Sequence, residues 1–141
     1  MRYAPESMAK EYTIETAAED LEAALRLLGG RWKLVILFNL FGGQVRRFSD
    51  LERAIPGVTQ KMLGQQLKSM ESDGIVVRTV YPEVPTRVEY QLTEWGQSLC
   101  PTLDAFLKWF EQRPNADKAS TLTKNLMATS MRRMKKKSFE Q

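Results

Sequence analysis

Polar side chains between Thr59 and Ser72 recur at the spacing of a helix face. Leu63, Leu67 and Met70 fall at i, i+4 and i+7, so a helix over this stretch would bury them on one stripe. Successive helical residues turn by ~100°, which places the opposite stripe in solvent. That stripe carries amine, amide and hydroxyl groups, on Lys61, Gln65, Lys68 and Ser72.

These groups suit binding to nucleic acid. Lys61 can reach a guanine edge or a phosphate, and Gln65 is suited to bidentate pairing with adenine. Lys68, further along the helix, is placed for a phosphate. The first turn, which would lead into a major groove, holds Thr59, Gln60 and Met62. The competing interpretation is an ordinary solvated helix face.

The residue types present give little support to catalysis. The chain has one cysteine and no histidine, which excludes an internal disulfide, the usual zinc spacings and Ser-His or Cys-His pairs. The sequence also contains no glycine-rich phosphate loop. We therefore expect no enzyme activity, no metal and no cofactor.

Two short helices joined by a turn would position the polar face. Residues 49–55 open with Ser49 and Glu52 at the spacing of a capping box, and Pro56-Gly57 stops this first helix. Thr59 is a suitable N-cap for the second helix. The pattern predicts a helix-turn-helix.

A β-hairpin follows directly. Gly74 would end the second helix as a left-handed residue, and residues 75–81 are β-branched and aromatic, as in a strand. Residues 82–85 include two prolines and predict a loop, after which 88–92 alternate apolar and polar. A helix-turn-helix followed by a hairpin is a winged helix, whose second helix enters the major groove.

Further cations are candidates for phosphates. Arg78 and Arg87 flank the hairpin loop and could hold the flanking backbone or the minor groove. Either could instead pair with Glu83 or Glu89, a surface pair worth ~0–1 kcal/mol. Three more candidates lie elsewhere, namely Lys33, Arg46 and Arg47, the last of which could instead stabilise its own helix.

Several motifs resemble the HxlR-type winged-helix family. They are Gly30-Arg31-Trp32-Lys33, Arg47-Phe48-Ser49-Asp50-Leu51, Lys61-Met62-Leu63, Asp73-Gly74, and the hairpin from Tyr81-Pro82-Glu83-Val84-Pro85 to Tyr90-Gln91-Leu92-Thr93. The resemblance covers Leu21 to Trp109. It implies a MarR-like transcriptional regulator that binds operator DNA as a homodimer. Some members sense oxidants through a cysteine in the first helix, but residues 18–21 hold none, so the resemblance does not extend thiol sensing to Cys100, which we expect to be structural.

The remaining elements complete a small helical domain. Thr16 and Glu19 have the spacing of a capping box for a first helix that ends at Gly29-Gly30. Residues 32–41 are apolar almost all round and predict a buried central helix. Residues 46–48 could form a short strand that pairs with the hairpin.

A long helix from Thr93 to about Arg113 has an apolar face wider than so small a domain covers easily. We expect it to pair with the first helix of a second subunit, although it could simply complete the monomer core. The expected dimer residues are Leu21, Leu25, Trp95, Leu99, Leu103, Phe106, Trp109 and Phe110. A small apolar effector could bind at this seam, or the seam could be packed shut.

Charge divides the chain into three parts. The domain at 16–113 lies between a flexible arm (1–15) and a basic tail (114–141), which is either solvated or a supplementary nucleic-acid contact. Within the domain, residues 31–87 carry nine Lys and Arg against five Asp and Glu, as phosphate binding requires. No apolar run could span a bilayer and no signal segment is present, so we expect a cytoplasmic protein that does not bind membranes.

The sequence thus predicts a mainly α fold with a small β-hairpin wing, a winged helix-turn-helix that dimerises through its N- and C-terminal helices. The expected function is sequence-specific binding of double-stranded DNA by a homodimeric transcriptional regulator, most simply a repressor, on a pseudo-palindromic operator. The alternative is a winged-helix protein-interaction module. Such a module should lack the Lys61, Gln65 and Lys68 face.

Overall fold

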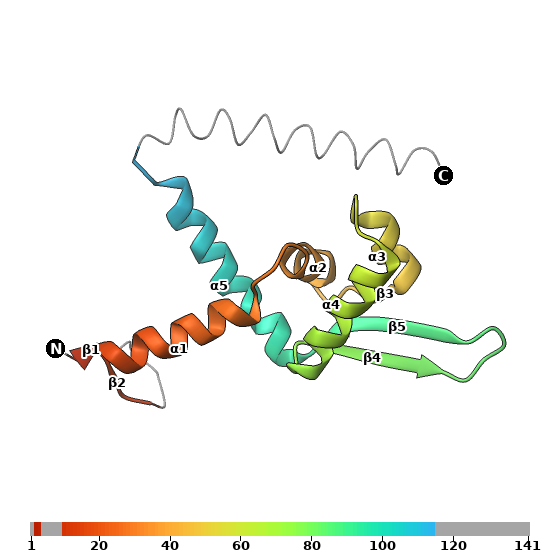
Figure 1. Cartoon of the computed structure of the whole chain (residues 1–141), viewed down its shortest axis with the longest axis horizontal. Helices are drawn as coiled ribbons and strands as arrows, with labels where there is room; N and C mark the ends of the chain where they lie inside the picture. The colour runs from red at the N-terminus through yellow and green to blue at the C-terminus, as the bar shows by residue number, and fades with distance from the viewer. Residues whose placement is uncertain (1, 4–9, 115–141) are drawn as a thin grey trace.

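The computed structural model describes residues 2–3 and 10–114. Its elements are β1 Arg2–Tyr3, β2 Tyr12–Thr13, α1 Ile14–Leu27, α2 Lys33–Leu40, β3 Arg46–Arg47, α3 Phe48–Ala54, α4 Gln60–Ser72, β4 Val76–Tyr81, β5 Arg87–Leu92 and α5 Glu94–Glu111. Within this range the helices and the antiparallel sheet β3-β5-β4 form the expected winged helix-turn-helix (Figure 1). Residues 1 and 4–9 of the expected arm, and the expected tail beyond residue 114, lie outside the described residues.

Helix α4 has the boundaries that the sequence predicts. The Thr59 hydroxyl accepts a backbone hydrogen bond at 3.1 Å and so satisfies one N–H group of the first turn. At the other end Gly74 has φ +79°. Its amide donates to the carbonyl of Glu71, and the amide of Ile75 donates to the carbonyl of Met70. These two bonds form a Schellman motif, so α4 stops where the hairpin begins.

Helix α3 begins earlier than expected. The carboxylate of Asp50, not that of Glu52, accepts from the amide of Arg47 at 2.9 Å. The same carboxylate accepts from Arg53 at 2.6 Å. The bond from the Arg47 amide is the main reason that the pKa of Asp50 lies below its usual value. The predicted box of Ser49 and Glu52 is therefore wrong.

The core lies between α2, α3, α4 and the sheet. Helix α4 buries its predicted stripe, Leu63, Leu67 and Met70. Helix α2 buries Ile36, Leu37 and Leu40. Phe38, however, is 48% exposed, and Leu34 is exposed as well. The expectation that this helix is buried all round is wrong, because the rest of the domain covers only one of its sides.

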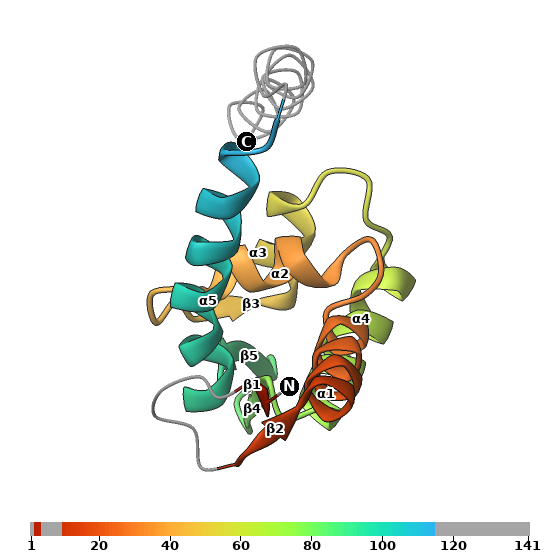
Figure 2. The same ribbon diagram turned by 90° about the vertical axis from the view of Figure 1, so that its left-hand side faces the viewer.

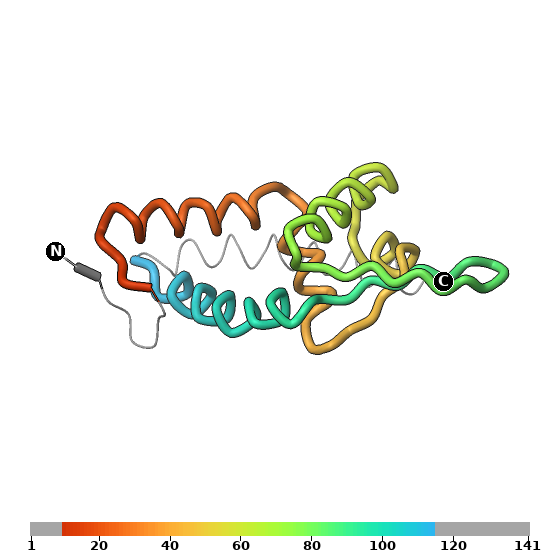
Figure 3. Tube along the Cα trace, turned by 90° about the horizontal axis from the view of Figure 1, so that it is seen from below, coloured from red at the N-terminus to blue at the C-terminus, as the bar shows by residue number. Residues whose placement is uncertain are grey.

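The hairpin of β4 and β5 is the wing. It pairs antiparallel from Val76 opposite Leu92 to Tyr81 opposite Arg87. Strand β3 adds to β5 with Arg46 opposite Tyr90, which confirms the predicted short strand. The tip of the wing projects away from the helices, at the right of Figures 1 and 3.

Helix α1 also begins earlier than predicted. The Thr13 hydroxyl accepts from the amide of Thr16 at 3.2 Å, and the Thr16 hydroxyl accepts from the amide of Thr13 at 2.9 Å. The predicted cap of Thr16 with Glu19 is therefore wrong, since Thr16 serves as the third helical residue of an earlier capping box. Strand β2 precedes this box and pairs with β1.

Helices α1 and α5 extend from the body on the side away from the wing (Figure 3). Figure 2 looks at this side and shows α2 between them in projection. No residue of α1 is buried. Thr93 caps α5 as predicted, accepting from the amide of Gly96 at 3.0 Å. The two outer helices thus leave long surfaces without a partner from the described part of the chain.

Candidate nucleic-acid interface

Helix α4 presents its polar face to solvent. The four residues predicted to point outward are all exposed, namely Lys61, Gln65, Lys68 and Ser72. The buried leucine and methionine stripe on the opposite side fixes this orientation. Within the described residues neither Lys61 nor Lys68 forms an ion pair. Their ammonium groups are therefore free to meet an anionic partner.

The first turn of α4 is divided between surface and core. Thr59 and Gln60 are exposed, whereas Met62 is half-buried and packs against the core. The first N–H groups of a helix lack intrahelical acceptors and favour a phosphate. The turn can thus contribute backbone donors beside Gln60, while the Met62 side chain mainly holds the helix in place.

A cleft of about 320 Å³ separates the second half of α4 from the wing. Lys68 and Arg78 line it from the two sides, and Gly64, Glu71 and Tyr90 complete it. Arg78 is exposed and, within the described residues, has no ion-pair partner. Lys68 and Arg78 were predicted separately, and the structure brings them together. Gly64 and Tyr90 were missed, because only the pairing of β4 with β5 places Tyr90 beside Arg78.

Arg87 is engaged within the wing. Its guanidinium lies 3.2 Å from the carboxylate of Glu83 and 3.5 Å from that of Glu89. It also stacks on the ring of Tyr81, with 3.9 Å from Cζ to the ring centroid. Of the two roles that the sequence allows, the structure therefore shows ion pairing within the wing, to Glu83 of the loop and to Glu89 of the same strand.

The other predicted cations lie at the margins of α4 and the wing. Lys33 is the first residue of α2 and is half-buried. Arg46 is half-buried in β3, where its Nε atom is buried and has no hydrogen-bond partner among the residues that the structure describes. Arg47 is exposed, and its amide forms the capping bond of α3. Arg47 thus takes the structural role through its backbone, which leaves its side chain in solvent.

The expected dimer residues fall into two groups. Leu99 and Leu103 are half-buried and pack against the core of their own subunit. The others are exposed on the outer helices, and they are Leu21, Leu25, Trp95, Phe106, Trp109 and Phe110. Trp109 is 67% exposed, and its ring lies edge-on to Phe106 with centroids 5.5 Å apart. Large aromatic side chains exposed together in this way are typical of a surface that binds another molecule.

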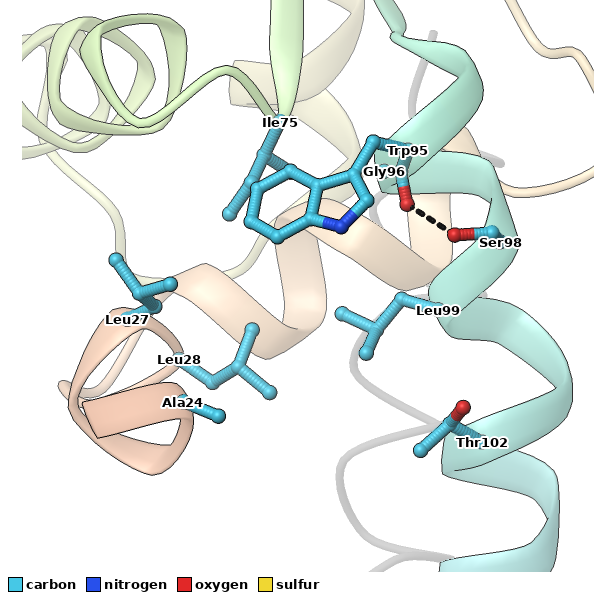
Figure 4. Close-up of a pocket in the computed structure, with 9 residues that line it drawn as sticks. All are labelled: Ala24, Leu27, Leu28, Ile75, Trp95, Gly96, Ser98, Leu99 and Thr102. Carbon is cyan, nitrogen blue, oxygen red and sulfur yellow. Dashed lines mark hydrogen bonds between the residues drawn. The ribbon is translucent and has the colours of Figure 1, made fainter. Parts of the chain in front are cut away.

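A pocket of about 210 Å³ lies between the end of α1 and the start of α5 (Figure 4). Its walls are mostly apolar, and the Trp95 indole of α5 lies on the side facing Leu27, the last residue of α1, and Leu28, its C-cap. Ile75, which follows α4 after Asp73 and Gly74, forms another part of the wall. The pocket therefore lies between the two outer helices and the turn that follows α4.

Other kinds of site are absent from the described residues. They contain no group of three or more metal-binding side chains. No helix in residues 10–114 is both long and apolar enough to cross a bilayer. Cys100 is half-buried and not in a disulfide.

Comparison with known proteins gives consistent matches. A family model described as HxlR-like helix-turn-helix matches residues 27–120. The HTH-type transcriptional regulator YtcD of Bacillus subtilis (strain 168) is 47% identical over 100 residues, covering 71% of this chain and 75% of that protein.

Two solved structures share the fold. The reduced form of the transcriptional regulator YodB from B. subtilis has 39% identity and a TM-score of 0.61, covering 66% of this chain and 90% of that one. A transcriptional regulator of the MarR family from Enterococcus faecalis V583 has 35% identity and a TM-score of 0.67, covering 83% of this chain and 99% of that one.

Proposed function

The chain belongs to the HxlR-like helix-turn-helix family and is a DNA-binding transcriptional regulator, and we propose that it acts as a homodimeric repressor on a pseudo-palindromic operator. The family and its relatives are regulators rather than enzymes. Occupying an operator requires no reaction, so the proposal assigns the chain no enzymatic activity and places it in the cytoplasm with its DNA.

Helix α4 is the reading helix of this proposal. Its exposed residues would enter the major groove from the N-terminal turn, with Gln60 and Lys61 leading and Gln65 behind them. Gln65 would read an adenine edge, and Lys61 a guanine edge or a phosphate. Lys33, Arg46 and Arg47 would add phosphate contacts at the margin.

Homodimer formation would cover the exposed outer helices. The aromatic side chains of α5 and the leucines of α1 would pack against a second copy, as in an obligate interface. Two-fold symmetry would then place the two α4 helices about 34 Å apart, one turn of DNA. A pseudo-palindromic operator follows from that spacing.

The pocket beside Trp95 is the proposed place for an inducer. Its apolar walls suit a small apolar molecule, and it borders both the proposed seam and Ile75 at the end of α4. A ligand there would act on DNA binding only if it bound the free and operator-bound forms with different affinity.

The observation that carries the proposal is the exposed, unpaired polar face of α4, held outward by Leu63, Leu67 and Met70. A mobility-shift titration against genomic and random duplexes tests it. We expect a subset of genomic fragments to bind at least 1000-fold more tightly than random DNA, on the order seen for specific regulators. Equal affinity for every duplex would overturn the specific-regulator proposal and leave the protein-interaction module as the better explanation.

A further inference from the structure

The wing has two faces with different chemistry. Directly opposed residues of paired strands point to the same side, and side chains alternate along each strand. Arg78 therefore shares the face of its partner Tyr90, which is buried toward the core. Arg87 lies on the other face, opposite Tyr81. We call the side of Arg78 the inner face and the side of Arg87 the outer face.

The base of the inner face carries positive charge. Arg78 and Lys68 line one cleft between the wing and α4 together with the carboxylate of Glu71, and within the described residues neither cation forms an ion pair, so the cleft keeps an excess of positive charge. When a reading helix lies in the major groove and a wing lies over the adjacent minor groove, the sugar-phosphate strand between these grooves passes between helix and wing. The cleft is where that strand would run, so two cations there suit a phosphate.

Beyond Arg78 the inner face of the wing is apolar. Val80 is paired with Val88 on this face and is 46% exposed. Val84 at the tip is 102% exposed. We call the part of the wing beyond Arg78, residues 79–88, its outer half. Its one cation, Arg87, lies on the outer face, where Glu83 and Glu89 neutralise it. The outer half therefore has no unpaired cation to bind a phosphate, but it has apolar side chains that are exposed to solvent.

Apolar side chains on a projecting ribbon suit the deoxyribose rims of a minor groove, which carry no charge. This inference rests on the proposed DNA-binding function. We propose that the wing binds duplex DNA in two parts: Lys68 and Arg78 hold one phosphate at its base, and Val80, Val84 and Val88 contact deoxyribose beyond it. Arg87 is a positioning residue that stabilises the hairpin from the outer face and touches no phosphate.

The salt dependence of binding separates the two parts. Each neutralised phosphate contributes about 0.9 to the slope of log K against log salt concentration. Because both residues hold the same phosphate, Lys68→Gln and Arg78→Gln should each lower the slope by less than about 0.9, and the double variant should lower it by about 0.9 in total rather than about 1.8. Arg87→Gln should lower affinity through a looser wing but leave the slope unchanged.

For the valines of the outer half we expect the opposite result, a change in affinity without a change in salt dependence. Val84→Ala and Val80→Ala should each weaken binding about three- to tenfold without changing the slope, since they remove apolar area and no charge. Val77→Ala is the matched control, because Val77 is a 39% exposed valine on the outer face of the same strand. It should leave both affinity and slope unchanged. Thermal melting of each variant checks that the fold is intact.

Two results would overturn the inference. A loss of about one unit of slope in Arg87→Gln would make Arg87 a phosphate contact. Unchanged affinity in both Val80→Ala and Val84→Ala would remove DNA as the occupant of the outer half and indicate a protein partner instead. Because the slopes can be measured on random duplexes too, these outcomes are separate from failure of the specific-regulator proposal.

Discussion

The carbonyl oxygen of Ile75 occupies the space that a side chain at Gly96 would need. A Cβ placed on Gly96 would overlap that oxygen and press on the Ile75 side chain. Ile75 closes the Schellman motif of α4, and Gly96 lies in the first turn of α5. Thr93 strengthens the joint, because its hydroxyl donates to the carbonyl of Gly74 at 2.7 Å. The start of α5 is thereby fixed against the end of the reading helix.

Gly96→Ala should destabilise the protein. Alanine favours a helix interior over glycine by ~1 kcal/mol, but the overlap with a backbone carbonyl cannot be relieved by rotating a side chain. We expect a net loss of ~1–3 kcal/mol in the free energy of unfolding, measured by urea denaturation. Gly64→Ala is the control, since its Cβ would meet Phe48 at an ordinary 3.9 Å. If both substitutions stabilise the protein, Gly96 does not pack against the Ile75 carbonyl as closely as described.

Alanine substitutions at Lys61 and Gln65 should affect DNA binding in different ways. Lys61→Ala should weaken binding to operator and random duplexes at every salt concentration, because it removes a charge. Gln65→Ala should instead cost ~1–3 kcal/mol on the preferred operator and little on random DNA. Titrations of both duplex types at several salt concentrations measure the difference. Lys108→Ala, a cation removed from α5, should change neither, and a uniform loss in Gln65→Ala would contradict its assigned role in reading bases.

The sequence predicts elements well where the determining signals are local. Thr59, Gly74 and Thr93 fix their helix ends through hydrogen bonds within a few residues, and all three predictions are confirmed. The caps at Thr16 and Ser49 were wrong for a related reason. A suitable partner, Thr13 or Asp50, lies within three residues of each predicted cap, and sequence spacing alone does not choose between them.

The environment of the candidate DNA-binding side chains depends more on contacts between residues far apart in the sequence, and the sequence alone predicts these contacts less well. The outward face of α4 follows from helical periodicity and is confirmed. The sequence favours a DNA contact for Arg87 over an ion pair, but its surroundings depend on the fold of the hairpin, which sets Glu83 and Glu89 beside its guanidinium. The exposed Phe38 of α2 is a similar case, because an apolar helix does not show which of its sides will be covered.

Asp50 should make the start of α3 sensitive to acid. Its folded pKa lies below the ordinary value of 3.8, chiefly because the amide of Arg47 donates to it. A lowered folded pKa means that the ionised carboxylate stabilises the fold above the unfolded pKa, and that this contribution is lost as pH falls through the lower folded value. Asp50→Asn should therefore cost ~0.5–1 kcal/mol at pH 7, with the difference from wild type shrinking below about pH 4.

Urea midpoints measured between pH 3 and pH 7 check this prediction for Asp50. Glu22→Gln removes an exposed carboxylate from α1 and should leave the midpoint at pH 7 unchanged. A deficit in Asp50→Asn that stays constant down to pH 3 would show that the carboxylate charge does not stabilise α3.

Phe106→Glu should separate the proposed dimer. Phe106 is 54% exposed on α5 and lies edge-on to Trp109, so a second copy would bury both rings together. A carboxylate there would be buried without a partner at the seam, which costs several kcal/mol on each side of the two-fold axis. Sedimentation should therefore show dimers for the wild-type protein and monomers for the variant at micromolar concentration.

Lys108→Glu introduces a carboxylate on the opposite side of the same helix and should remain dimeric. A dimeric Phe106→Glu would move the interface away from this face of α5, and a monomeric wild type would remove the two-fold arrangement on which a pseudo-palindromic operator depends.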